Sequence, residues 1–163
     1  FWTNGERPQN PRYAALQADG WADYRLRVDG LVANPVELTY EQLRGMPKQE
    51  QITQHFCIQG WSGVAKWVVF YSFSDGPVGG RYYDCHPIAS QYHELTILAY
   101  EMNGEPLNES HGAPLRLRDE VELGFKQVKW IEAIEFVETF EHLGAGQGGY
   151  NEDQEFYGFR MPI

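Results

Sequence analysis

The chain has 163 residues and a net charge of −10, and 42% of its residues are hydrophobic. This length suits one domain with a single sizeable core, and the composition is that of a folded chain rather than a disordered one. The acidic charge argues against nonspecific nucleic-acid binding, and no apolar run approaches the roughly 18 residues that a membrane-spanning helix needs. The sequence therefore predicts a soluble domain with no nucleic-acid partner and no membrane span, and it leaves a cytoplasmic or a periplasmic location open.

The first predicted elements are an arm and a hairpin. Residues 1–12 are rich in Pro, Asn and Gly, which predicts an extended N-terminal arm. Residues 24–28 alternate between apolar and polar side chains, as a strand with one wet face does. Asp29-Gly30 is a turn signal and Leu31-Val32 resumes the apolar pattern, so a β-hairpin is expected here.

A short helix is predicted after the hairpin, followed by strands. Thr39 stands three residues before Gln42, which is the spacing of a capping box, and the helix is expected to end near Gly45. The pattern then predicts short strands and a glycine-rich C-terminal tail at 144–163. Many strands and few helices indicate one β-rich α+β domain over residues 1–163. The predicted strands cover residues 51–57, 67–73, 95–102, 115–118 and 128–137.

The first motif with chemical potential surrounds Cys57. The segment reads His-Phe-Cys-Ile-Gln-Gly-Trp-Ser over residues 55–62. A cysteine at a strand end, followed at once by a glycine turn, places its sulfur in a crevice on a rigid support. A soft thiolate in such a place suits a transition metal.

The second motif gathers cations in an acidic chain. Residues 111–116 read His-Gly-Ala-Pro-Leu-Arg, and residues 124–130 read Gly-Phe-Lys-Gln-Val-Lys-Trp. Glycines allow the backbone to approach a ligand closely, Arg offers a planar fork for phosphate, and Lys offers a point charge. The two segments predict an anion or phosphate pocket, although a strand pair with solvated charges would have the same composition.

The two cysteines leave an alternative open. Cys57 and Cys85 could form one disulfide in an oxidising compartment, in which case the chain would be a non-catalytic β-rich binding module. A zinc site from His55, Cys57, Cys85 and His86 is disfavoured, because the Cys-x2–4-Cys spacing of paired zinc ligands is absent.

Together the two motifs resemble the molybdopterin-binding domain of the sulfite oxidase family, in a bacterial, sulfite oxidase-like form. That family includes eukaryotic sulfite oxidase, plant nitrate reductase and bacterial periplasmic methionine sulfoxide reductase. The stretch Leu-Ala-Tyr-Glu-Met-Asn-Gly-Glu-Pro-Leu at residues 98–107 is similar to its connecting segment, and the resemblance covers roughly residues 20–140. It implies a β-rich, mixed-sheet α+β fold and a molybdenum-molybdopterin cofactor.

The resemblance also implies roles for particular residues. Cys57 is the expected molybdenum ligand and the one expected catalytic residue. The expected molybdopterin-binding residues lie in the two segments of the second motif, in the strand at 67–73 and in the N-terminal arm. They are Asn4, Ser72, His111, Arg116, Gln127, Val128 and Lys129.

The implied activity is two-electron oxygen-atom transfer at a Cys-ligated oxo-molybdenum centre, on a small oxyanion or sulfoxide-type substrate. A separate electron-transfer partner, a haem or flavin protein, is expected, because the chain shows no haem-binding domain. It also shows no immunoglobulin-like dimerisation domain. Relatives carry a helical excursion of roughly twenty residues before the strand at 67, in the length range of a helix with its loops. We therefore expect that a segment is missing between Trp67 and Val68.

Overall fold

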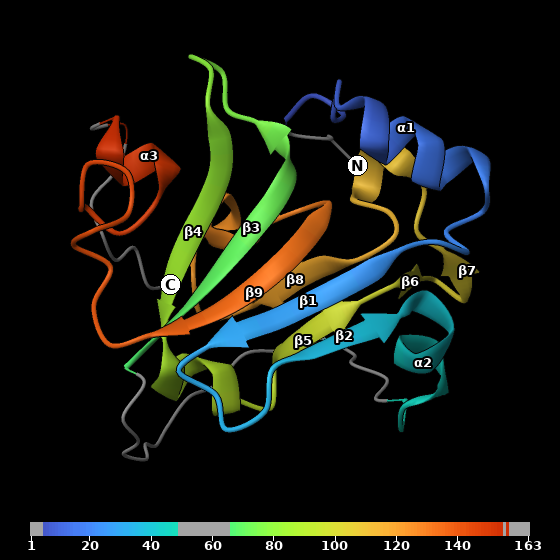
Figure 1. Ribbon diagram of the computed structural model, residues 1–163, viewed down its shortest axis with the longest axis horizontal. Coiled ribbons are helices and arrows are strands. Elements are labelled where there is room, and N and C mark those ends of the chain that lie inside the picture. The colour runs from blue at the N-terminus through green and yellow to red at the C-terminus, as the bar shows by residue number, and fades with distance from the viewer. Residues whose placement is uncertain (1–4, 49–65, 155, 157–163) are drawn as a thin grey trace.

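The computed structural model describes residues 5–48, 66–154 and 156, and its centre is a five-stranded mixed sheet (Figure 1). β1 pairs in parallel with β9, and the other neighbours in this sheet are antiparallel. The strand order is β2-β1-β9-β3-β4, so the last strand in sequence lies in the middle. The strands are β1 (Arg25–Gly30), β2 (Val36–Thr39), β3 (Trp67–Asp75), β4 (Arg81–Pro87) and β9 (Ile131–Val137).

Two small sheets and short helices complete the described fold. β5 pairs antiparallel with β8, and β6 pairs with β7. These layers and helix α1 lie around the large sheet, with α3 near the end of β4 (Figure 1). The elements are α1 (Pro11–Ala18), α2 (Tyr40–Gly45), β5 (Thr96–Ala99), β6 (Glu101–Met102), β7 (Glu105–Pro106), β8 (Arg116–Asp119) and α3 (Tyr150–Asp153), with the 3-10 turns η1 (Ile88–Tyr92), η2 (Glu109–His111) and η3 (Gly124–Lys126).

β3 is buried on both faces, which explains its nearly continuous apolar sequence. Val68 and Phe70 pack into the main core between the large sheet and the β5-β8 layer. Val69 points to the other face, into a second cluster with Cys85 and Tyr150. The C-terminal segment covers this second cluster, and it pairs with β4 through an Asp84–Gly149 bridge.

Several sequence predictions are confirmed. The hairpin is formed by β1 and β2, although the second strand begins at Val36, because Leu31 instead donates its N–H to Phe136 of β9. Thr39 caps α2, and the capping box with Gln42 is complete. The mixed-sheet α+β class is also as predicted.

The expected break between Trp67 and Val68 is wrong. Both residues lie in β3, and they pair in unbroken register with Pro87 and His86 of β4 on one side. They pair equally regularly with β9 on the other side. Consecutive Cα atoms 3.80 Å apart are what such a ladder requires, so the chain is continuous at this point.

The N-terminal third and β4 differ from the sequence predictions. Residues 11–18 form α1 rather than the end of an extended arm and the loop after it. Asn10 accepts the N–H of Arg12, and Pro11 stands at the first helical position, a favoured combination for starting a helix. The sequence pattern does not predict β4, because its seven residues alternate little in polarity.

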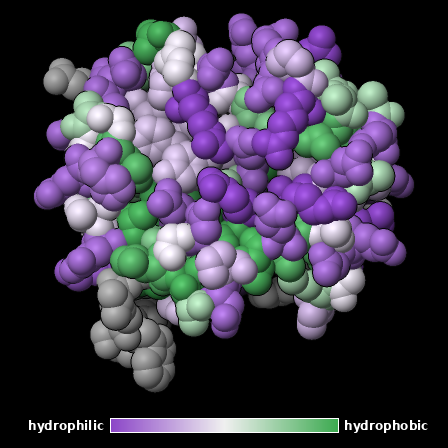
Figure 2. All heavy atoms as spheres, in the orientation of Figure 1, coloured by the Kyte–Doolittle hydropathy of each residue, from purple (hydrophilic) through white to green (hydrophobic). Residues whose placement is uncertain are grey.

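Cys85 is a free, fully buried thiol in β4, so the Cys57–Cys85 disulfide of the alternative hypothesis is not formed. Burial raises the pKa of this thiol, which makes it a poor metal ligand. Across the part of the chain that the structure describes, no helix has the length and hydropathy to span a bilayer. Figure 2 shows a mostly hydrophilic face interrupted by hydrophobic patches.

Candidate functional site

The first part of the site is the turn before β8. Asn108 caps η2 by accepting the backbone N–H of His111 at 3.0 Å. The same side-chain oxygen lies 2.7 Å from His111 Nδ1, so this nitrogen donates and Nε2 is left as the acceptor. Gly112 follows in the left-handed region with φ of 101°, which turns the chain toward β8.

The second part is the segment 124–129, which we call the cofactor loop. It starts with η3 and ends at Lys129, just before β9. Val128 is buried in the main core, and its carbonyl accepts the N–H of Leu117. Trp130, with φ of 56°, then turns the chain into β9. A non-glycine residue in this region is strained, and such strain gathers at functional sites.

The two parts are joined by direct contacts. Lys129 Nζ donates to the carbonyl of Ser110 at 3.0 Å, and Trp130 Nε1 donates to the carbonyl of Glu109 at 2.7 Å. A Cβ at Gly112 would come within 3.0 Å of Lys129 Cβ and 3.2 Å of Arg116 Cβ. We call Gly112, Arg116 and Lys129 the anion cradle, because glycine at this position lets the two cations approach each other.

The electrostatics of the anion cradle favour an anion. Burial, and then the neighbouring Arg118, lower the pKa of Arg116 to about 10. Burial, and then Arg116, lower the pKa of Lys129 to about 8. Glu120 acts in the opposite direction on Arg116 but does not offset these effects, so desolvation and a neighbouring positive charge dominate at both cations.

A buried polar atom shows that the cradle fits an anionic ligand. Arg116 donates from one guanidinium nitrogen to the carbonyl of His111 at 3.1 Å. Its Nε is buried and has no hydrogen-bond partner among the described residues. A donor of this kind next to a second cation is what a phosphate group requires.

Ser72 of β3 contacts the backbone of the anion cradle. It follows an irregularity in the pairing of β3, its side chain is buried, and its hydroxyl donates to the carbonyl of Lys129 at 2.8 Å. The hydroxyl also accepts the N–H of Ser74 at 3.0 Å. Ser72 thus holds the backbone of Lys129 in place.

The structure brings together five of the eight predicted site residues: Ser72, His111, Arg116, Val128 and Lys129. Gln127 belongs to the same loop; its amide donates to the Glu122 carbonyl, and its Oε1 is buried with no partner among the described residues. Cys57 and Asn4 lie outside the described residues. The neighbouring Gly5 is described, and a Cβ added to it would lie 3.6 Å from the Trp130 ring, so this part of the arm adjoins the site.

Sequence reasoning misses the buried groups that support the cofactor loop. The sequence suggests His86 only as a zinc ligand, yet it is fully buried and contacts Asp119 and the Lys126 carbonyl. Lys126 is also buried and forms ion pairs with Asp84 and Glu152. Lysine and glutamate are seldom fully buried unless paired, so only the fold could reveal this set.

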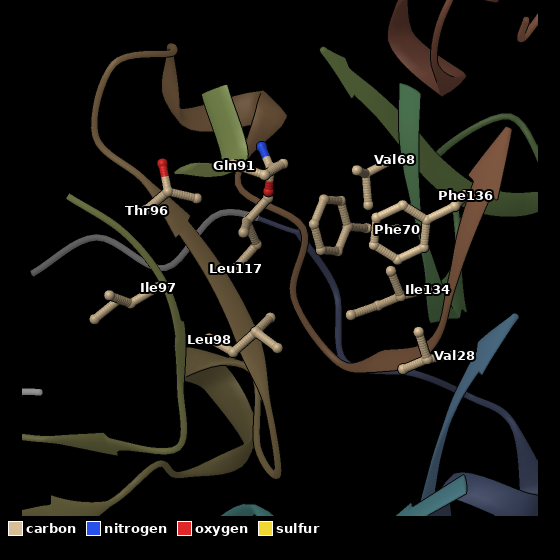
Figure 3. A pocket seen from close by; sticks show the side chains of 10 residues that line it. All are labelled: Val28, Val68, Phe70, Gln91, Thr96, Ile97, Leu98, Leu117, Ile134 and Phe136. Atoms are coloured by element: carbon tan, nitrogen blue, oxygen red, sulfur yellow. The ribbon is translucent and has the colours of Figure 1, made fainter. Parts of the chain in front are cut away.

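An apolar cavity of about 230 Å³ lies between the large sheet and the β5-β8 layer. In Figure 3, Val68, Phe70 and Ile134 face Leu117 and Leu98 across it. The polar side chains of Gln91 and Thr96 stand at one end, and both donate to Asp119.

Comparison with known proteins identifies the class. The family model of the oxidoreductase molybdopterin binding domain matches residues 13–63 and 59–143. The chain therefore belongs to this sulfite oxidase-like family of molybdopterin-binding oxidoreductases, whose cofactor contains molybdenum. The two matched ranges overlap at residues 59–63, shortly before the point where relatives are expected to carry an additional helical segment.

Particular relatives agree with this assignment. YedZ1 of Azospira oryzae, a putative protein-methionine-sulfoxide reductase subunit, is 32% identical over 152 residues, covering 85% of this chain and 56% of that protein. MsrP of Xanthomonas campestris, a protein-methionine-sulfoxide reductase catalytic subunit, is 31% identical over 170 residues, covering 85% of this chain and 52% of that protein. The chain thus spans little more than half the length of these relatives.

A solved structure confirms the fold. The sulfane dehydrogenase SoxCD from Paracoccus pantotrophus matches with a TM-score of 0.55 at 21% identity, covering 72% of this chain and 39% of that chain. At this identity the likeness shows the fold alone. It agrees with the mixed sheet expected from the sequence.

Proposed function

We propose that this chain is a molybdenum-cofactor oxidoreductase that carries out two-electron oxygen-atom transfer on a sulfoxide-type substrate. The observation that carries the proposal is the anion cradle, where Arg116 and Lys129 are partly desolvated beside each other. This charge arrangement suits the phosphate of molybdopterin, and both segments of the second motif lie within the family match at residues 59–143.

Individual residues would hold the cofactor in distinct ways. Arg116 would donate from Nε and Lys129 from Nζ to phosphate oxygens. Gln127 Oε1 offers an acceptor for a pterin N–H group, and His111 Nε2 offers another. The side chain of Val128 faces the core, and its backbone N–H and carbonyl bond to Lys126 and Leu117, so Val128 would hold the cofactor loop in place. Ser72 would act through the carbonyl of Lys129.

Cys57 is the proposed molybdenum ligand. Its segment precedes a glycine turn, and the only other cysteine is buried and unsuited to metal binding. When bound, the cofactor would supply the two-electron oxygen-atom transfer, and the protein would supply binding, orientation and electrostatics.

The substrate class rests on the relatives. Both named relatives belong to protein-methionine-sulfoxide reductases, which favours a sulfoxide over a small oxyanion such as sulfite. Reduction of a sulfoxide consumes two electrons, so a haem or flavin protein is the proposed partner that delivers them.

The test uses chain produced in a host that makes the cofactor. We expect about one molybdenum per chain and reduction of methionine sulfoxide with a reduced dye as electron source. Cys57→Ser should lose the metal and the activity while remaining folded. The control Cys85→Ser, which changes a buried thiol, should keep its metal. Metal retained in Cys57→Ser, or lost only in Cys85→Ser, would contradict the assignment.

A further inference from the structure

His86 is completely buried at the end of β4, and both of its ring nitrogens face acceptors. Nδ1 lies 2.8 Å from a carboxylate oxygen of Asp119, and Nε2 lies 2.9 Å from the carbonyl oxygen of Lys126. A neutral imidazole carries one N–H and can satisfy only one of them. Either His86 is an imidazolium or Asp119 carries the proton.

The surroundings of Asp119 decide between these forms. Thr96 and Gln91 each donate to its carboxylate, at 3.2 Å in both cases. Burial raises the pKa of Asp119, but the hydrogen bonds from His86, Thr96 and Gln91 outweigh it and keep the pKa below its ordinary value. The donors around Asp119 favour its carboxylate form, and an N–H at each ring nitrogen of His86 then satisfies both acceptors.

The contact at Nε2 falls on the turn that aims the cofactor loop. The Lys126 carbonyl also accepts the N–H of Val128 at 3.1 Å, and the intervening Gln127 has φ of −87° and ψ of 77°. These values describe an inverse γ-turn. The turn leads directly to Lys129 of the anion cradle, so a shift of the Lys126 carbonyl would move the cation that follows.

We propose that His86, held as an imidazolium by Asp119, is a positioning residue that fixes the cofactor loop by donating from Nε2 to the Lys126 carbonyl. This inference rests on the proposed function, because it assumes that the loop holds the anionic part of the cofactor. The two ring nitrogens of His86 bond to Asp119 and to the Lys126 carbonyl, so His86 acts on the cradle through the backbone of Lys126.

Other groups around His86 are consistent with this role. The ring of Phe70 lies edge-on at 5.4 Å between centroids and closes the apolar side. The ammonium of Lys126 donates to the carbonyl of Cys85, the residue before His86, at 3.2 Å. Asp119 is the charged group that contacts the His86 ring, and burial prevents water from replacing either hydrogen bond of the ring.

The test compares two double variants, because removing one partner alone would leave a buried unpaired charge. His86→Leu with Asp119→Asn removes both charges and the Nε2 donor. His86→Gln with Asp119→Asn also removes both charges, but the glutamine Nε2 restores a donor toward Lys126. The readout is the pterin retained per chain during dialysis, measured by fluorescence of the released pterin, with folding followed by circular dichroism.

We expect the leucine double variant to lose pterin about tenfold faster than the parent chain, since a hydrogen bond from a charged group has been removed. The glutamine double variant should recover most of this loss. Leu26→Ala in β1, a buried core residue away from the loop, serves as the control for lowered stability. In ¹⁵N spectra of the parent chain at neutral pH, both ring nitrogens of His86 should be protonated.

Equal pterin retention in the leucine variant and the parent chain would overturn the proposal, as would a neutral imidazole in the spectra. If Leu26→Ala lost pterin equally fast at the same melting temperature, the role of His86 would be purely structural, and the proposal would also be overturned. If the parent chain itself held no pterin, the proposed function would fail instead, so the two failures are distinguishable.

Discussion

At the residue scale, the anion cradle depends on two half-buried cations that lie close together. Lys129 is the more sensitive of the two, because its pKa is lowered to about 8 whereas that of Arg116 is lowered to about 10. Near neutral pH both remain charged. The charge of Lys129 changes first as the pH rises.

Anion affinity should therefore fall as the pH rises through about 8. Below this value Lys129 is an ammonium, and above it an anion can bind only if the amine first takes up a proton, which costs up to about tenfold per pH unit. Calorimetric titration of the cofactor-free chain with pyrophosphate between pH 6.5 and 9.5 measures this. Lys129→Arg should remove the dependence near pH 8, and an unchanged slope in that variant would assign the effect to another group.

Gly112→Ala should weaken cofactor binding without unfolding the chain. The new Cβ would lie 3.0 Å from Lys129 and 3.2 Å from Arg116, at a φ of 101° that disfavours side chains. We expect a stability cost of about 1–3 kcal/mol and a reduced pterin content. Gly45→Ala is the matched control, because nothing lies within 4 Å of that position. Normal pterin content in Gly112→Ala would show that the close approach is unimportant.

At the element scale, the two faces of β3 differ in packing. Val68 lines the apolar cavity, whereas the adjacent Val69 points to the second cluster and is fully buried. The same substitution at these neighbours should therefore have opposite effects.

Val68→Ile should raise the free energy of unfolding by about 0.8 kcal/mol, because the added methylene enters existing space. Val69→Ile should lower it by about 1–3 kcal/mol, because it overpacks a filled cluster. Urea denaturation of both variants checks the signs. Two equal losses would mean that the cavity cannot accept the extra group.

The C-terminal segment is attached to the sheet through a buried charge cluster. Lys126 forms ion pairs with Asp84 and Glu152. Both carboxylates lie close to Gly149, because a Cβ added to this glycine would lie 2.5 Å from Glu152 and 3.0 Å from Asp84. Burial raises the pKa of Asp84 well above its ordinary value, and Glu152 adds to the shift. Asp84 is fully buried, which gives it this structural role.

Lys126→Met should destabilise the chain by about 3–5 kcal/mol near neutral pH, because two buried carboxylates lose their counter-ion. Glu152→Gln should cost less, since one ammonium then faces one carboxylate. Thermal unfolding orders the two variants. A Glu152→Gln variant less stable than Lys126→Met would show that the hydrogen bond to Glu152 matters more than the charge balance.

At the scale of the whole molecule, the net charge of −10 bears on the electron partner. The face in Figure 2 is mainly hydrophilic, which suits transient contacts better than a permanent apolar interface. A basic electron donor would be steered to this acidic chain over a distance set by ionic strength.

Reduction of the loaded protein by a basic donor protein should therefore slow as salt is added from about 0.02 to about 0.3 M. The Debye length is roughly 10 Å at 0.1 M, so this range changes the screening strongly. Reduction by a neutral dye should change little over the same range. Stopped-flow rates measure both. A rate that rises with salt for the basic donor would indicate a docking face of like, positive charge, and an unchanged rate would indicate an apolar one.

The sequence by itself determined the elements whose cause is local. The capping box of α2 and the pairing of β1 with β2 depend on residues close together in the chain, so they can be predicted directly, although the connection between the two strands is longer than the sequence predicts. The family motifs likewise predict that Arg116 and Lys129 serve one anion site, and the structure joins their segments through Ser110 and Gly112. The roles of Cys57 and Asn4 remain predictions.

Only the tertiary structure decided the features that depend on distant pairing. β9 lies in the middle of the sheet and pairs in parallel with β1, although about a hundred residues separate them. The β5-β8 layer and the C-terminal segment bury the two faces of β3, and the cluster under the C-terminal segment puts Cys85 out of reach of solvent. His86 meets Asp119 and Lys126 from 33 and 40 residues away, so its charge and its role follow from hydrogen-bond partners that no local pattern can supply.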